Sequence, residues 1–277
     1  TAIVINNWFM MYFLSVVLIG TIYPIFLDVL SSQKISVGPP FYHKLIIPFL
    51  IPFLLIMAIG PKLKWIKSNL EDKAYLFTLL IISILLSIFI VKNYSSNFLI
   101  NSVLISSGLY LFFTTIRDFF SKGFKNLSQN TAHFGFSLLI LSILFNNLFS
   151  TEIITNLKVG ETFENSKAKI VFESISQNQK KNYNSIVAKF TVQDSAGKLE
   201  NLSPELRIYN QPNIATSEAD IKTTLLSDKF IVINVVQNQE FFNVRYQVKP
   251  FMLWIWISVI LISVGGLISF MKKEYEK

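Results

Sequence analysis

Six stretches of the chain are almost entirely apolar, and each is about as long as a membrane-spanning helix. Because about 20 helical residues cross the ~30 Å hydrocarbon core of a bilayer, the pattern predicts six transmembrane helices. The composition agrees: 52% of the 277 residues are hydrophobic and 15% are charged, whereas soluble domains carry about 25% charged residues. The expected helices cover residues 8–26, 41–59, 74–91, 98–116, 131–149 and 251–271.

Residues 151–249 follow a different pattern, in which apolar and polar residues alternate. A period of two indicates strands with one buried face, and residues 194–197 and 237–240 have the composition of hairpin turns. The pattern predicts five or six strands in a small antiparallel sheet or barrel. The expected strands lie at 170–175, 186–192, 206–209, 230–232 and 242–248.

Together the two patterns predict a polytopic α-helical membrane protein with a small all-β soluble domain inserted before the last helix. We expect a membrane domain with five transmembrane helices over residues 1–150 and an outer-side β domain over 151–249. Residues 250–277 would form the last transmembrane helix and a short inner tail.

Basic residues are distributed unevenly over the loops between these helices. The loops at 60–73, 117–130 and 272–277 hold ten Lys or Arg, whereas the short loops on the opposite side hold only Lys34, Lys44 and Lys92. Cytoplasmic or matrix loops carry the excess of positive charge, so both termini are expected inside and the β domain outside. The ten are Lys62, Lys64, Lys67, Lys73, Arg117, Lys122, Lys125, Lys272, Lys273 and Lys277.

The net charge of +8 does not indicate a nucleic-acid partner. Residues 151–250 contain twelve basic and eleven acidic residues, so the surplus belongs to the membrane part of the chain. A nucleic-acid-binding domain would instead show a basic patch or stripe.

One of the two histidines, His133, lies inside a predicted membrane helix. An ionisable side chain in a membrane span faces protein rather than lipid, and imidazole is a common ligand of haem iron. Two interpretations are open: a polar residue hydrogen-bonded between helices, or a haem ligand whose small neighbours Gly135 and Ser137 make room for the macrocycle. The second histidine, His43, is expected to be an interfacial residue at the outer end of the second helix.

The remaining polar and aromatic residues point to structure rather than to catalysis. The chain has no cysteine, which excludes disulfides, a CxxCH haem-attachment site and thiolate metal sites. No nucleophile–base pair or carboxylate pair stands out, so the catalytic residues are unknown. Trp254 and Trp256 are expected in an interfacial aromatic belt, and Gly265 with Ser269 in close helix packing.

Six short patches occur in a fixed order along the chain. They are Gly-Thr-Ile-Tyr-Pro at 20–24, Ile-Ser-Val-Gly-Pro-Pro-Phe at 35–41, Gly60-Pro61 with Trp65, Ala-His-Phe-Gly at 132–135, Lys-Pro-Phe-Met-Leu-Trp-Ile-Trp at 249–256 and Gly-Gly-Leu at 265–267. Together they resemble, over nearly the whole chain, the C-terminal half of the CcmF family. This family is the haem lyase component of the multi-subunit cytochrome c maturation system.

The resemblance implies a role in cytochrome c maturation. CcmF proteins receive haem from a haem chaperone and help attach it to the CxxCH cysteines of apocytochrome c. The family's Ala-His-x-Gly histidine, an axial ligand of a membrane haem b, corresponds to His133. The location it implies is the mitochondrial inner membrane with the β domain in the intermembrane space, or the bacterial inner membrane if the chain is prokaryotic.

The resemblance also implies that the chain does not act alone. The tryptophan-rich haem-handling motif, its flanking histidines and the second axial histidine belong to the family's N-terminal half. Lyase activity and haem b binding are therefore expected to need a separate N-terminal CcmF chain or the remainder of a longer chain.

Two other functions stay open from the sequence. The chain could be a CcmF-derived, non-catalytic structural subunit of a larger inner-membrane (respiratory) assembly, without a haem of its own. A transporter is suggested by the prolines within 41–59, but the few intramembrane charges and the lack of an inverted repeat argue against it.

Overall fold

The computed structural model describes residues 2–31, 35–62, 73–94, 97–121, 126–194, 197–235 and 240–275. It divides into two compact units, described separately below. The helical unit comprises Thr1–Leu144 and Ile257–Lys277, and the sandwich unit comprises Phe145–Trp256. Several residues used in the sequence analysis lie outside the described residues or have side chains that are not described: Lys34, Lys64, Trp65, Lys67, Lys122, Lys125, residues 195–196, residues 237–239, Lys272, Lys273 and Lys277.

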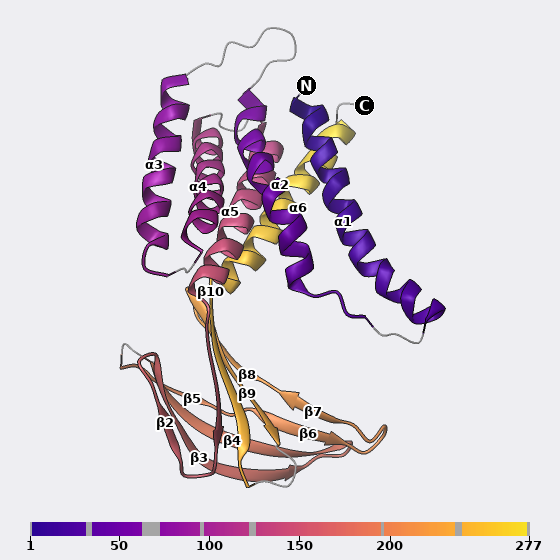
Figure 1. Cartoon of the computed structure of the whole chain (residues 1–277), viewed down its shortest axis with the longest axis vertical. Coiled ribbons are helices and arrows are strands. Elements are labelled where there is room, and N and C mark those ends of the chain that lie inside the picture. The colour runs from indigo at the N-terminus through magenta and orange to yellow at the C-terminus, as the bar shows by residue number, and fades with distance from the viewer. Residues whose placement is uncertain are drawn as a thin grey trace. The chain divides into compact units, whose positions relative to one another are not determined.

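Six long helices occur in the described part of the chain (Figure 1). Each is long and apolar enough to cross a membrane, which confirms the predicted six spans. They are α1 (Ala2–Leu30), α2 (Pro39–Ile59), α3 (Lys73–Val91), α4 (Phe98–Ser121), α5 (Leu127–Phe149) and α6 (Met252–Tyr275).

Most of these helices are longer than the apolar stretches from which they were predicted. Helix α4 continues past residue 116 to Ser121, and α5 begins at Leu127 rather than at residue 131. Hydropathy marks the part of a helix that matches the hydrocarbon, whereas backbone hydrogen bonds can continue into polar sequence. The additional turns matter because they carry Asp118, Gln129 and Asn130.

Helix α2 is bounded by residues that suit its two ends. Gly38 precedes it, and Pro39 and Pro40 occupy its first turn, where a missing amide hydrogen costs nothing. At the other end a short 3₁₀ helix, η1 (Gly60–Lys62), follows directly. The side chain of Lys62 turns back towards α2, with its ammonium 3.5 Å from the Ala58 carbonyl oxygen.

Helices α5 and α6 approach closely at glycines. A Cβ atom on Gly265 would lie 2.7 Å from the backbone nitrogen of Ala132, and the Ser128 hydroxyl donates a hydrogen bond of 2.8 Å to the Gly265 carbonyl. A Cβ atom on Gly135 would lie 2.9 Å from the backbone nitrogen of Ile262. The close packing expected at Gly265 is therefore confirmed.

The sandwich unit contains ten strands among its described residues, and all of their pairings are antiparallel. One sheet has the order β1-β10-β9-β8, and the other has the order β2-β3-β4-β6-β7 with β5 also paired to β4. The strands are β1 (Thr151–Leu157), β2 (Thr162–Glu164), β3 (Ala168–Gln179), β4 (Tyr183–Asp194), β5 (Leu199–Leu202), β6 (Glu205–Tyr209), β7 (Ala215–Glu218), β8 (Asp220–Thr223), β9 (Ser227–Val235) and β10 (Phe242–Pro250).

This arrangement corrects the prediction of five or six strands in one sheet or barrel. The long strands β3, β4, β9 and β10 were found because each has enough residues to show alternation. Strands of three or four residues, such as β2, β7 and β8, are too short to show a period of two. The pattern therefore did not show that the strands divide into two sheets.

The two sheets share one apolar core. Buried side chains of β1, β9 and β10 meet those of β3, β4, β5 and β6. The rings of Phe172 and Phe190 stack with their centroids 4.4 Å apart, and Phe242 of the other sheet packs edge-on against Phe172. The alternation along β3 and β4 follows from this, because only every second residue reaches the core.

A buried ion cluster also connects the sheets. The ammonium of Lys229 on β9 lies 2.9 Å from Asp194 Oδ2 on β4 and 3.1 Å from Glu200 Oε2 on β5. Burial alone would raise the pKa of Glu200, but hydrogen bonds from Lys198 and Lys229 outweigh it and hold this pKa below its usual value. Burial likewise opposes charge on Lys229, while Asp194 and Glu200 raise its pKa. Glu200 and Lys229 are thus both charged near neutral pH.

Candidate functional site

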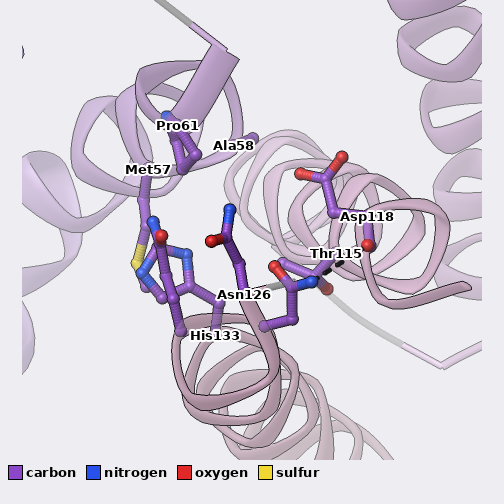
Figure 2. A pocket seen from close by; sticks show the side chains of 9 residues that line it. Met57, Ala58, Pro61, Thr115, Asp118, Asn126 and His133 are labelled. Carbon is purple, nitrogen blue, oxygen red and sulfur yellow. Dashed lines mark hydrogen bonds between the residues drawn. The ribbon is translucent and has the colours of Figure 1, made fainter. Parts of the chain in front are cut away.

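His133 lines two adjoining cavities in the helical unit. The larger has a volume of about 390 Å³ and is open on one side, a size typical of small-molecule sites, which range over about 300–1,000 Å³. The smaller, of about 50 Å³, is more enclosed and is shown in Figure 2. The larger is lined by Ile3, Asn6, Ile56, Met57, Gly60, Pro61, Gln129 and His133; the smaller by Met57, Ala58, Pro61, Thr115, Asp118, Asn126, Gln129, Asn130 and His133.

The two cavities differ in the chemistry of their walls. The larger is bounded mainly by apolar side chains from α1 and α2, such as Ile3 and Ile56. The smaller is bounded by polar groups from α4 and α5, including Asp118 and Asn130. In Figure 2 the side chains of Met57 and His133 lie on one side of the pocket, and Asp118 lies on the other. The half-buried imidazole of His133 therefore borders both an apolar space and a polar space.

An ion pair fixes the polar wall. The ammonium of Lys62 lies 2.8 Å from Asp118 Oδ2, and these side chains are only 12% and 15% exposed. The Asn130 side-chain amide donates a hydrogen bond of 3.2 Å to the Asp118 carbonyl oxygen, which ties α5 to α4. The end of α2, the end of α4 and the start of α5 are thus held together around His133.

Sequence reasoning missed this ion pair. It treated Lys62 as part of a charged loop that sets topology, and it gave Asp118 no role. The available signal was that Asp118 is the single acidic residue within α4, but its partner is 56 positions away along the chain. Only the fold brings the two residues together.

The small neighbours of His133 do not make room for a ligand. Gly135 packs against α6 at Ile262. Ser137 lies with its hydroxyl 2.8 Å from the Thr115 hydroxyl and donates a hydrogen bond to the Phe134 carbonyl oxygen. Neither residue is among the described residues that line the two cavities. The open space lies instead beside α1 and the Gly60–Pro61 turn.

The structure does not bring the two histidines together. His43 is exposed in the first turns of α2, whereas the cavities lie at the opposite end of that helix, near Ala58. At 1.5 Å per residue the fifteen positions between them span about 22 Å. No second histidine occurs among the described residues that line either cavity.

The donor set fits one axial position of a haem. A haem iron takes imidazole as an axial ligand, and His133 offers one beside a largely apolar space that is open on one side. The second axial ligand of the iron would have to come from a residue other than the lining residues described above. In the described ranges no three His, Cys, Asp or Glu residues are grouped so that they could hold a bare metal ion.

The fold defines a class of protein: a polytopic membrane protein of six membrane-length helices with a β-sandwich inserted before the last. Residues 148–250 match the family model described as the CcmF C-terminal beta-sandwich. A solved structure, "Cytochrome c Heme Lyase CcmF", has the same fold, with a TM-score of 0.72 at 19% identity over 96% of this chain and 44% of that chain.

Curated relatives align along almost the entire chain. It is 26% identical over 285 residues to the cytochrome c-type biogenesis protein CcmF of Pseudomonas fluorescens, covering 98% of this chain and 43% of that protein. It is 25% identical over 281 residues to CcmF of Escherichia coli, with the same coverage. The chain is therefore similar over almost its whole length to CcmF proteins, as its sequence patches predicted, and it spans less than half the length of these relatives.

Proposed function

We propose that this chain acts in cytochrome c maturation as the C-terminal part of a haem lyase, in which His133 supplies one axial ligand of a membrane haem b. Relatives that align over nearly the whole chain are named as cytochrome c-type biogenesis proteins, and the structural neighbour is named as a haem lyase. The observation that carries the proposal for the site is the position of His133 on the wall of the 390 Å³ cavity.

Each part of the site would have a separate task. The imidazole of His133 would bind the iron, while the apolar side chains of α1 and α2 would exclude water from the macrocycle. The Lys62–Asp118 pair would hold η1 and α4 in position and keep a fixed pair of charges near the site. A haem bound there supplies one-electron chemistry, and its potential depends on axial ligands and burial.

An N-terminal partner is inferred from the part of the relatives that does not align with this chain. The relatives extend over more than twice the aligned length, so the second ligand and the haem-handling surface would belong to an N-terminal half, on another chain or on the same one. In this proposal a haem chaperone and apocytochrome c are the further partners. The uneven loop charge supports an outer-side sandwich, in the intermembrane space if the membrane is the mitochondrial inner membrane.

The test compares the only two histidines of the chain. The protein is purified together with its N-terminal half, and haem is measured by a reduced-minus-oxidised spectrum and a pyridine haemochrome assay. We expect His133→Ala to lose the b-type signal and His43→Ala to retain it. Co-purification of the N-terminal half checks that each variant is assembled.

Two results would reject the assignment. A b-type signal that persists in His133→Ala would show that another residue binds the haem. Absence of haem from the assembled wild-type protein would favour the structural-subunit function over a haem-binding one.

A further inference from the structure

The tip of the β8–β9 hairpin presents two leucines to the surroundings. Leu225 and Leu226 are 62% and 64% exposed, in a turn position where Gly, Asn, Asp and Ser are the usual residues. The turn is closed by hydrogen bonds between Thr224 and Ser227, with the Thr224 amide 2.9 Å and its hydroxyl 2.7 Å from the Ser227 carbonyl oxygen. The leucines are therefore held outward by an ordered turn.

The same tip is attached to the beginning of α6, within the sandwich unit. The amide of Phe251 donates a hydrogen bond of 2.8 Å to the Leu226 carbonyl oxygen. The indole N–H of Trp254 donates one of 3.0 Å to the Leu225 carbonyl oxygen. Phe251 has a φ of 61°, which is uncommon for a residue with a side chain, and its bond to the tip helps to hold that conformation.

These contacts fix the tip near the point where the chain enters the membrane. The membrane-length span of α6 begins at Met252, one residue after Phe251 and within one helical turn, about 5.4 Å, of Trp254. Trp256, also exposed, follows on the next part of the helix, and tryptophan is enriched at membrane interfaces. Leu225 and Leu226 are thus at the level of an interface that α6 already defines.

We propose that the Leu225–Leu226 tip inserts into the boundary between lipid headgroups and acyl chains. Exposed leucines are unfavourable in water, whereas apolar groups of interfacial segments enter this boundary by about 5–10 Å. The occupant is lipid rather than protein because the tip is continuous with the membrane-entry turn of α6. The sandwich would then be attached to the bilayer at the tip as well as through its two flanking helices, and this inference does not depend on haem binding.

Site-directed spin labelling tests the proposal in the full protein reconstituted in bilayer nanodiscs. The chain contains no cysteine, so Leu225→Cys and Leu226→Cys each introduce a single labelling site in it. Leu226 is bonded to Phe251 and Leu225 to Trp254 through backbone carbonyls, which the substitutions leave in place. The matched control is Val235→Cys. Val235 is 49% exposed and lies at the opposite end of β9, which at 3.3 Å per residue is about 30 Å from Leu226.

The readout is the collision of each label with oxygen, which concentrates in lipid, and with a water-soluble nickel chelate. We expect labels at 225 and 226 to collide strongly with oxygen and weakly with nickel, and the label at 235 to show the reverse. Labels at 225 and 226 that are as accessible to nickel as the control would overturn the proposal. Low accessibility to both reagents would also overturn it, because it would show a protein partner covering the tip.

Discussion

The two units of this protein differ in how many polar side chains they bury and how many apolar side chains they expose. In the sandwich the buried residues are mostly large and apolar, with Phe172, Phe190 and Ile231 almost fully enclosed. In the helical unit many large apolar side chains such as Leu85 and Phe89 are exposed, while Ser83 and Ser87 are completely buried. Water surrounds the sandwich, so its apolar groups move inward. Hydrocarbon surrounds the helices, so small polar groups can pack and hydrogen-bond inside.

A buried polar group therefore means something different in each unit. In the sandwich the buried charges of Lys229 and Glu200 are an exception, and they are tolerated because each lies beside an opposite charge. In the helical unit small polar side chains are common among the buried residues, and those near His133 line open space. Buried polar groups connect the two sheets in the sandwich, whereas in the helical unit they line a candidate ligand site.

The largest stability effect should come from breaking the ion cluster. Lys229→Met leaves the carboxylates of Asp194 and Glu200 without their shared cation, which should cost about 3–5 kcal/mol. Native-state hydrogen exchange of the β9 and β4 amides in the full protein measures this loss.

A matched control is the exposed pair between Lys158 and Glu240, whose side chains are 49% and 87% exposed and 3.1 Å apart. Lys158→Met should cost less than about 1 kcal/mol. Equal losses in the two variants would contradict the view that burial gives the Lys229 cluster its importance.

Alkaline pH should weaken the sandwich through a buried tyrosine. Burial raises the pKa of Tyr246 to about 12 from its ordinary value of 10.0. The unfolded chain then loses this proton near pH 10 while the folded chain keeps it, so the contribution to stability is complete below pH 10 and is lost as pH rises towards 12. At about 1.36 kcal/mol per pKa unit the loss approaches roughly 2–3 kcal/mol.

Urea unfolding followed by near-ultraviolet circular dichroism at a series of pH values measures this effect. Tyr246→Phe should flatten the pH dependence between 10 and 12 relative to the wild type. An unchanged slope would assign the alkaline loss to other groups, such as Lys229.

Helix packing in the membrane unit should respond to a single methyl group. Gly265→Ala places a carbon 2.7 Å from the Ala132 backbone nitrogen, so α5 and α6 must separate, at a cost of about 1–3 kcal/mol. Gly266→Ala meets no atom within 4 Å and should be neutral or stabilising, by up to about 1 kcal/mol. Detergent-induced unfolding of both variants measures the difference, and indistinguishable curves would rule out close packing at Gly265.

The helices were predictable because the thickness of a bilayer sets their length and apolar character. The long strands were predictable for a similar reason, since one water-facing side produces alternation in segments such as β4 and β10. The short strands β2, β7 and β8 carry no such periodic signal. Their placement depends on pairing with distant residues, which local sequence does not record.

The candidate site was predictable only in part. His133 stood out because an ionisable side chain in a membrane span faces protein rather than lipid. The Lys62–Asp118 pair was not predicted, because its two charged residues lie near the ends of different helices that are far apart in the sequence. Gly135 and Ser137 were assigned to the ligand space because they are small, whereas small residues in membrane helices equally serve close helix packing.

The central claim, that His133 binds a haem iron, is tested most directly by exchanging the ligand rather than removing it. The assembled protein carrying His133→Met is compared with wild type by absorption spectroscopy and redox titration, with His43→Met as the control. A methionine ligand raises the potential of a haem, so we predict a changed spectrum and a higher midpoint potential for His133→Met alone. A spectrum and potential identical to wild type in that variant would contradict the account.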